Sequence, residues 1–544
     1  MAFPAGTPDP RVRSYHLPTR VVWTSEYGVS APEHLLTDDA HACLLQPPKG
    51  GKTAGILLDF GRELHGGVRL ETPMITPKKP ALVHVRFGES VGEAMGTPDQ
   101  DHTIHEHTIL VPWMGHIEIG NTGFRFVRID LIDPEATVTL DKVKAVSLMR
   151  PLEYLGSFKC SDARLNQIWE TGAYTVHLCM QDYVWDGIKR DRLVWIGDMH
   201  PETMVISTVF GENPIVPASL DYVRNRTPLP NWMNGISSYS LWWILCQRDW
   251  YRYHGNLAYL REQRKYLVSL LELVRKNLDD NGREHLNGLR FLEWPTSRDN
   301  TAIDAGLQAL VSLALRAGSE LCEILGEKEA GAAAKAAADR AARVQRAPSE
   351  SKQANALLVL AGSADAAETN RRTLSRNPYS GLSTFYGYYI LEARARAGDY
   401  QGCLDLMRNY WGGMLDRGAT TFWEGFEREW LEGSGRIDEL TPPGKKDLHA
   451  DYGDYCYVGL RHSLCHGWAS GPTAWLSQYV LGISPETPGF DRIRLDPHLG
   501  DLEWAEGSVP TPHGLVKVRH EKRNGRVETE IDAKPDVKKR IKKA

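Results

Sequence analysis

Two segments of the chain set carboxyl groups among tryptophans, a combination that suits carbohydrate chemistry. The first, residues 181–202, carries five acidic side chains, three basic ones and two indoles. Carboxylates accept hydrogen bonds from sugar hydroxyls, guanidinium groups donate them, and an indole packs on the apolar face of a sugar ring. The same residues would also suit a salt-bridged loop over the core, so this segment alone leaves both interpretations open. Its candidate site residues are Asp186, Arg190, Asp191, Trp195, Asp198 and Glu202.

The second segment, residues 419–430, reads ATTFWEGFEREW and places Glu424 directly after Trp423. Its bulky apolar residues favour a dry cleft for this carboxyl group, although an exposed acidic helix end could have the same composition. Burial raises a carboxyl pKa, and an opposite charge lowers it. Two carboxyl groups in unequal environments can therefore divide the roles of acid and base.

Two shorter segments add further polar and aromatic groups. Glu293 precedes Trp294 in one, and His462 and His466 lie near Trp468 in the other. The histidines have the i, i+4 spacing of a helical metal pair, but no HExxH motif or further ligand cluster accompanies them. The chain also lacks the GxSxG, GxxxxGKS/T and strand–GxGxxG–helix motifs. We therefore expect neither a metal nor a cofactor.

The composition is that of a globular protein without a nucleic-acid or membrane partner. The 544 residues include 64 Lys and Arg against 69 Asp and Glu, a formal charge of −5, with 42% hydrophobic and 24% charged residues. So small a charge gives no general attraction to nucleic acid or anionic lipid. No apolar run reaches the ~18 residues of a membrane span. The first residues hold no apolar signal-peptide core, which predicts a cytoplasmic protein; a homo-oligomer is left open.

Aromatic and cysteine usage give weaker indications. There are 16 Trp and 21 Tyr against 12 Phe, a bias toward rings with a polar atom that suits sugar binding but also a large core. The eight cysteines form no CxxC pair, which indicates buried free thiols.

Hydrophobic patterning divides the chain into three domains. Residues 1–155 alternate apolar and polar side chains between frequent glycines and prolines, which predicts a β-sandwich. Residues 156–485 carry roughly ten to twelve helical patterns, enough for a toroid of paired helices whose loops line a pocket at one end. Residues 486–544 return to strands, with Asn524-Gly525 as a hairpin turn, and predict a small β-domain. The basic ending KPDVKKRIKKA is expected to fray.

Several stretches resemble the α-L-rhamnosidases of glycoside hydrolase family 78, in that family's order. The main one, DGIKRDRLVWIGD from Asp186 to Asp198, is similar to the family signature DCPQRDERLGWTGD. The others are DFGRELHGGVRLE from Asp59, GNTGFRFVRIDL from Gly120, LCHGWASGPTAWL from Leu464 and GISPETPGFDRIRLDP from Gly482. The resemblance implies a six-hairpin glycosidase: an (α/α)6 toroid flanked by an N-terminal β-sandwich and a small C-terminal β-sandwich.

The resemblance implies an inverting hydrolase that releases terminal α-L-rhamnose from small glycosides or oligosaccharides. Inverting enzymes pair an acid, which protonates the leaving oxygen, with a base that activates water on the opposite face, ~6.5–9.5 Å away. The family's base matches Glu424. Its acid is the Glu of RDERLGW, which this chain lacks; aligned from Trp195 and Asp198, Asp191 falls on that position. Aligned from the left, Asp186 matches the family's first Asp and is the rival for the acid role.

Carried over residue by residue, the resemblance makes Trp195 an aromatic wall and Asp198 a hydroxyl acceptor, while Arg190 would bind hydroxyls or hold Asp191 ionised. Two alternatives stay open. The same fold could act on another sugar, as an α-L-arabinosidase, a uronide hydrolase or a lyase using Lys189, Arg190 and Arg192, or the protein could bind carbohydrate without catalysis. The predicted substrate-binding residues are Asp186, Arg190, Trp195, Asp198, Glu202, Glu293, Trp294, Trp423, His466 and Trp468.

Overall fold

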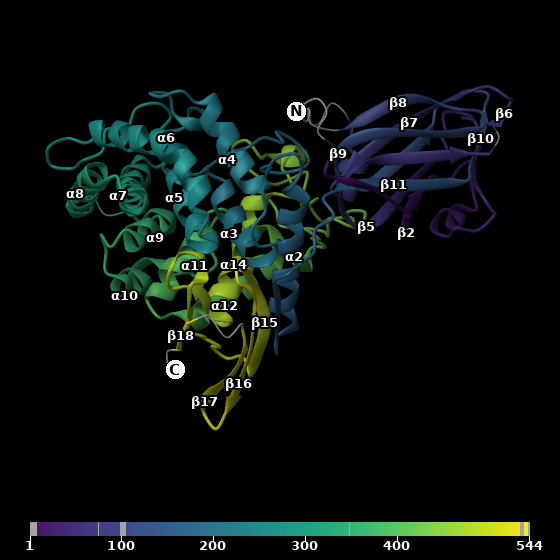
Figure 1. Ribbon diagram of the computed structural model, residues 1–544. Coiled ribbons are helices and arrows are strands. Elements are labelled where there is room, and N and C mark those ends of the chain that lie inside the picture. The colour runs from purple at the N-terminus through teal and green to yellow at the C-terminus, as the bar shows by residue number, and fades with distance from the viewer. Residues whose placement is uncertain (1–7, 74, 98–104, 348, 534–537, 542–544) are drawn as a thin grey trace.

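The N-terminal domain packs two antiparallel sheets against each other. The computed structural model describes residues 8–73, 75–97, 105–347, 349–533 and 538–541 (Figure 1). The larger sheet has the order β1-β11-β5-β9-β7-β8, with β2 paired to β5, and the smaller has the order β3-β4-β10-β6. The strands are β1 Val12–His16, β2 Arg20–Thr24, β3 Val29–Ser30, β4 Cys43–Leu45, β5 Gly55–Thr72, β6 Ile75–Thr76, β7 Ala81–Gly88, β8 Glu106–Val111, β9 Gly115–Leu131, β10 Thr137–Leu140 and β11 Lys142–Met149.

The alternation of side chains along β7 sets which face is buried. Val83, Val85 and Phe87 are at most 1% exposed. Leu82 and His84, on either side of Val83 in the sequence, are half-buried. Both sheets contribute to one core cluster, because period-two patterning turns one face of each sheet inward. The β-rich N-terminal domain predicted from the sequence is confirmed.

The helical domain is a closed ring of helix pairs. Contacts run from α3 to α5, α7, α9, α11 and α14, and from α14 back to α3. Each of these inner helices follows an outer partner along the chain, which gives six hairpins. The helices are α2 Ala163–Cys179, α3 Met199–Val209, α4 Ile215–Arg226, α5 Ser237–His254, α6 Leu257–Lys276, α7 Asn300–Leu325, α8 Lys328–Arg343, α9 Lys352–Leu360, α10 Ala366–Thr369, α11 Gly387–Arg396, α12 Tyr400–Asn409, α13 Trp411–Asp416 and α14 Gly471–Trp475.

The inner and outer helices of the ring differ in how much of their surface is buried. Every residue of the inner helix α3 is buried, whereas the outer helix α6 buries one stripe that includes Leu260, Leu267 and Leu271. An amphipathic stripe is what an outer helix needs to cover an inner one. Asp162 caps α2, the first helix of the ring, because its carboxylate accepts the N–H groups of Arg164 and Leu165.

The C-terminal domain pairs strands from both ends of the helical domain. Its four-stranded sheet has the order β12-β15-β16-β17, and a three-stranded sheet has the order β13-β14-β18. Figure 1 shows these strands below α12 and α14. The strands are β12 Ser157–Cys160, β13 Ile483–Pro485, β14 Arg492–Leu495, β15 Trp504–Thr511, β16 Gly514–Arg523, β17 Arg526–Asp532 and β18 Lys538–Ile541.

Two predictions for this domain have different outcomes. Asn524 and Gly525 form the turn between β16 and β17, with φ values of 50° and 75°, as predicted. The basic ending, residues 534–544, was expected to fray. Residues 534–537 and 542–544 lie outside the described residues, but residues 538–541 form β18 and pair in parallel with β14. The domain boundaries near residues 155 and 485 stay a prediction. Among the described helices, none combines the length and apolar composition that a membrane span requires.

Candidate active site

The predicted site segments meet at one end of the helical ring. Asp198 is at the N-cap of α3, Glu293 precedes α7, and His466 precedes the helical stretch that contains α14. Because the hairpins run antiparallel, the N-termini of the inner helices share one end of the ring. Side chains far apart in the sequence therefore gather there.

Arg190 joins the two proposed catalytic carboxyl groups. Glu424 is buried, and both of its carboxylate oxygens contact the Arg190 guanidinium. The other guanidinium nitrogen, Nη1, donates to Asp191 Oδ2 at 3.1 Å. One guanidinium touches both groups, so their nearest oxygens lie at most about 8 Å apart, within reach of the spacing of an inverting pair.

The two carboxyl groups have unequal surroundings. Burial opposes the charge of Glu424, but Arg190, then His466 and His462, outweigh burial and hold its pKa below the ordinary value. Asp191 is exposed and has a left-handed backbone with φ of 54°. The next residue, Arg192, is half-buried and has the same φ value. Such a conformation costs a non-glycine residue of order 1 kcal/mol or more, and it persists where surrounding contacts impose it.

A buried acidic cluster lies beside this pair. Asp186, Asp198 and Glu202 are each at most 3% exposed, and burial raises the pKa of all three. Tyr239 donates to Asp198 Oδ1 at 2.9 Å, and His466 Nε2 is 3.3 Å from Asp198 Oδ2. The cluster therefore favours protonated carboxyl groups, in contrast to Glu424.

Two members of the cluster have distinct environments. Asp186 Oδ1 accepts the Leu193 N–H at 2.9 Å, which fixes the carboxyl against the loop that carries Asp191. The Glu202 oxygens have no hydrogen-bond partner among the described residues. A Cβ at Gly467 would lie 1.6 Å from Glu202 Oε1, so the Glu202 carboxyl group packs directly against the backbone of Gly467.

The four predicted tryptophans differ in how far their side chains are buried. Trp195 and Trp294 are half-buried, the first edge-on to Tyr239 at 6.0 Å. Trp423 is fully buried, and Trp468 is 4% exposed. Trp468 Nε1 donates to the Glu424 main-chain oxygen at 2.9 Å, so it helps to position Glu424. Substrate contact by Trp423 and Trp468 stays a prediction.

A cavity of about 580 Å³ adjoins the site on the side of Trp294, with Glu427 and Tyr455 among its lining residues. Glu293 lies close by and is buried, accepts a hydrogen bond from Ser383, and burial raises its pKa to about 8. Burial also raises the pKa of Glu427 to about 7. Arg190, Asp191 and Glu424 are not among its lining residues, so a connection between the cavity and these three residues stays a prediction.

The N-terminal β-domain closes the opposite side of the site, which the sequence analysis missed. Lys189 Nζ lies 2.9 Å from Glu93 Oε1 and 3.8 Å from Glu89 Oε2, and it donates to the His462 carbonyl at 3.0 Å. Glu89 Oε2 also accepts the Leu464 N–H at 2.7 Å. Acidic residues within a β-rich segment were the available signal, but nothing in the sequence pairs residue 89 with residue 464.

These contacts bear on the uronide alternative. Lys189 is engaged in the buried ion pairs, and Arg192 donates to the Asn121 carbonyl at 2.6 Å. Arg190 contacts Glu424. The basic groups that a uronic acid would need are therefore largely committed to the protein itself.

Lys189→Met is expected to lower the free energy of unfolding by about 3–5 kcal/mol, because it leaves the buried Glu89 and Glu93 without their cation. Urea unfolding followed by circular dichroism measures the loss. Arg192→Met is the matched control, because it removes a hydrogen bond of a partly exposed side chain and leaves no buried carboxyl group without its cation. Equal midpoints for the two variants would contradict this role of Lys189.

The ring of six hairpins and the flanking β-sheets define the fold of the six-hairpin glycosidases. Residues 153–351 match the model of the bacterial alpha-L-rhamnosidase 6 hairpin glycosidase domain, and residues 482–541 match that of the bacterial alpha-L-rhamnosidase C-terminal domain. The chain thus carries these two domains of the bacterial α-L-rhamnosidases of glycoside hydrolase family 78, and the resemblance predicted from the sequence is confirmed.

Individual relatives agree with this assignment. An alpha-L-rhamnosidase of Alteromonas sp. (strain LOR) is 24% identical, over 85% of this chain and 53% of that protein. The GH78 rhamnosidase of Bacillus sp. GL1 is 25% identical with a TM-score of 0.76, covering 94% of this chain and 56% of its own. The rhamnosidase from Klebsiella oxytoca, solved with rhamnose bound, shares the fold at a TM-score of 0.67 and 18% identity, over 86% and 96% of the two chains. The chain thus spans about half the length of the Alteromonas and Bacillus proteins.

Proposed function

We propose that this protein hydrolyses terminal α-L-rhamnosyl residues of small glycosides or oligosaccharides with inversion, using Asp191 as the acid and Glu424 as the base. The observation that carries the proposal is one of position: the Arg190 guanidinium contacts both carboxyl groups and so holds them together at one end of the helical ring. Proton transfer from Asp191 requires this carboxyl group to part from Arg190 in the substrate complex. The rhamnose bound in the Klebsiella oxytoca structure, which shares this fold, supports the choice of sugar.

In this mechanism Asp191 gives a proton to the glycosidic oxygen as the C1–O bond breaks. Glu424 takes a proton from a water molecule, whose oxygen bonds to C1 from the opposite face. Trp195 and Trp294 offer ring faces to the sugar, and Asp186, Asp198 and His466 offer hydroxyl partners. The cavity beside Trp294 is suited to the rest of the glycoside.

In the proposed mechanism, Arg190 favours the ionised form of Glu424, which a base requires. Arg190→Gln removes the main positive charge that lowers the Glu424 pKa, so that pKa rises. The acidic limb of the kcat/KM profile is then expected to move up by about one to three pH units. A pH series from 4 to 9 measures the shift, with Arg192→Gln as the control. An unchanged acidic limb would contradict this role for Arg190.

The substrate is tested with a panel of 4-nitrophenyl glycosides. We expect hydrolysis of the α-L-rhamnoside at least tenfold faster than that of the α-L-arabinosides and uronides. A preference for a uronide would move the assignment to the rival chemistry within this fold. Binding of rhamnose with no turnover of any glycoside would favour a non-catalytic carbohydrate-binding protein. A cytoplasmic location stays part of the proposal.

A further inference from the structure

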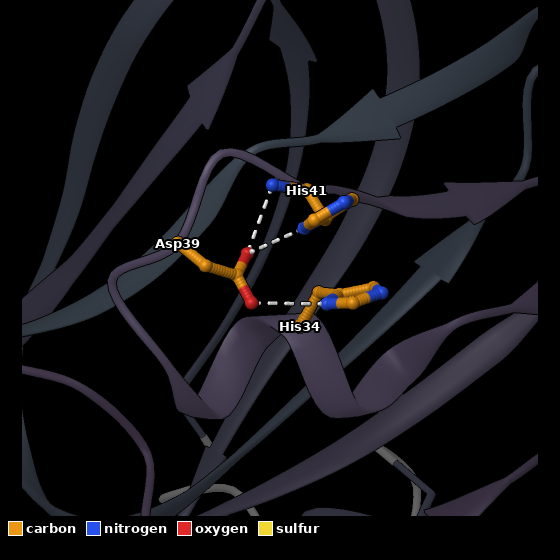
Figure 2. Close-up of side chains that lie close together, drawn as sticks. All are labelled: His34, Asp39 and His41. Atoms are coloured by element: carbon orange, nitrogen blue, oxygen red, sulfur yellow. Dashed lines mark hydrogen bonds and ion pairs between the residues drawn. The ribbon is translucent and has the colours of Figure 1, made fainter.

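Three side chains on the N-terminal β-domain bring together the donors of a transition-metal site (Figure 2). His34 Nδ1 is 3.1 Å from Asp39 Oδ2, and His41 Nδ1 is 3.5 Å from Asp39 Oδ1. One donor atom from each residue lies within 4.8 Å of the others. Two ligands of a tetrahedral Zn²⁺ with bonds of ~2.0–2.1 Å lie about 3.3 Å apart. The two histidine–carboxylate pairs therefore already have nearly the separation that a shared ion would impose, and the two imidazole nitrogens lie within 4.8 Å of each other.

The carboxylate at the centre is oriented by its own contacts. The His41 N–H donates to Asp39 Oδ1 at 2.8 Å, and the Thr37 hydroxyl donates to Oδ2 at 2.8 Å. Lys142 Nζ donates to the Asp39 carbonyl at 2.7 Å and ties the loop to β11. Partners that orient a ligand reduce the cost of binding a metal.

The two imidazoles are also pre-arranged. Their rings stack at 4.7 Å with an interplanar angle of 24°, and Figure 2 shows both facing the same carboxylate. His34 lies in the short 3-10 helix Pro32–Leu36, and His41 lies just before β4. The 3-10 helix thus supplies one ligand and the loop before β4 supplies the other two, so a bound ion would join the helix to this loop.

A second group, Glu89, Glu93 and His449, has similarly close donors. There the Lys189 ammonium lies 2.9 Å from Glu93 Oε1, so the position already holds a cation. Among the described residues, the Asp39 carboxylate forms ion pairs only with His34 and His41. Imidazole nitrogen with one carboxylate suits Zn²⁺ better than Ca²⁺ or Mg²⁺, which prefer oxygen.

We propose that His34, Asp39 and His41 form a Zn²⁺ site, with solvent completing the coordination. Its His-x4-Asp-x-His spacing does not match HExxH or the other metal motifs, so the sequence pattern did not indicate a site here. The site lies on a β-domain loop and is independent of the proposed glycoside hydrolysis. Its expected effect is on the stability of that loop.

Titration of the untagged, EDTA-treated full chain with ZnCl₂ by calorimetry tests the proposal. We expect one saturable equivalent, weakened about tenfold or more in His34→Ala and in His41→Ala, since each removes one of three protein ligands. His285→Ala is the matched control: His285 Nε2 is 3.3 Å from Asp279 Oδ2, a surface pair without a second imidazole. The control should bind Zn²⁺ like the native protein.

Thermal unfolding gives a second readout. Zn²⁺ should raise the Tm of the native protein and of His285→Ala, because a ligand that binds only the folded state stabilises it. It should leave the double variant His34→Ala/His41→Ala unchanged. The absence of saturable binding, or equal affinity in the native protein and the double variant, would overturn the proposal.

Discussion

Glu424→Gln is expected to lower kcat for hydrolysis of an aryl α-L-rhamnoside by about 10²–10⁴-fold, the usual contribution of a positioned acid or base. The amide cannot accept the proton of the attacking water. Its size is nearly that of the carboxyl group, so the wall built by Trp468 and Ser463 should remain in place. Initial rates at saturating substrate measure the effect.

The control and a rescue sharpen this expectation. Glu429→Gln changes an exposed carboxyl of the same segment and should retain nearly full activity. In Glu424→Ala, azide can enter the space of the missing carboxyl and attack C1 without a base, so added azide should restore turnover and give the β-L-rhamnosyl azide. A Glu424→Gln variant within tenfold of the native rate would remove Glu424 from the base role.

Asp191→Asn is expected to have an effect that depends on the leaving group. An alkyl α-L-rhamnoside needs a proton on its departing oxygen, so its kcat/KM should fall by about 10²–10⁴-fold. A 2,4-dinitrophenyl rhamnoside departs without that proton and should lose little. The comparison of the two substrates separates loss of the acid from loss of binding, which would affect both.

Asp186→Asn is the matched comparison, because Asp186 is the rival for the acid role. Burial raises the pKa of Asp186, so it would hold a proton in the folded protein. If the acid is Asp191, this variant should weaken both substrates alike, as a lost hydroxyl contact would. A leaving-group dependence in Asp186→Asn, with none in Asp191→Asn, would transfer the acid role to Asp186.

Much of the fold could be predicted because its signals are local. Alternation in β7, helical stripes such as that of α6 and the Asn524-Gly525 turn each depend on neighbours within a few residues. The pairing of β12 with β15 joins residues 157–160 to residues 505–508 and could not be read locally. Strand β18 was missed because a run of basic residues resembles a solvated tail, whereas main-chain pairing with β14 does not depend on side-chain polarity.

The site was predictable in its residue types and less so in its contacts. The acid–tryptophan segments around Asp191 and Glu424 do meet, but the bridging role of Arg190 depends on a contact across 234 residues. The support from Glu93 through Lys189 comes from another domain. Tyr239, which donates to Asp198, lies in an aromatic helix where nothing distinguishes it from the core residues around it.

The stereochemistry of the first product tests the central claim most directly. Hydrolysis of an aryl α-L-rhamnoside by the native protein, followed by ¹H NMR from the first minute, should show β-L-rhamnose before mutarotation. That result requires water to attack from the face opposite the leaving group, with one carboxyl group acting as acid and the other as base. Initial formation of α-L-rhamnose, or no hydrolysis by the folded protein, would contradict the account.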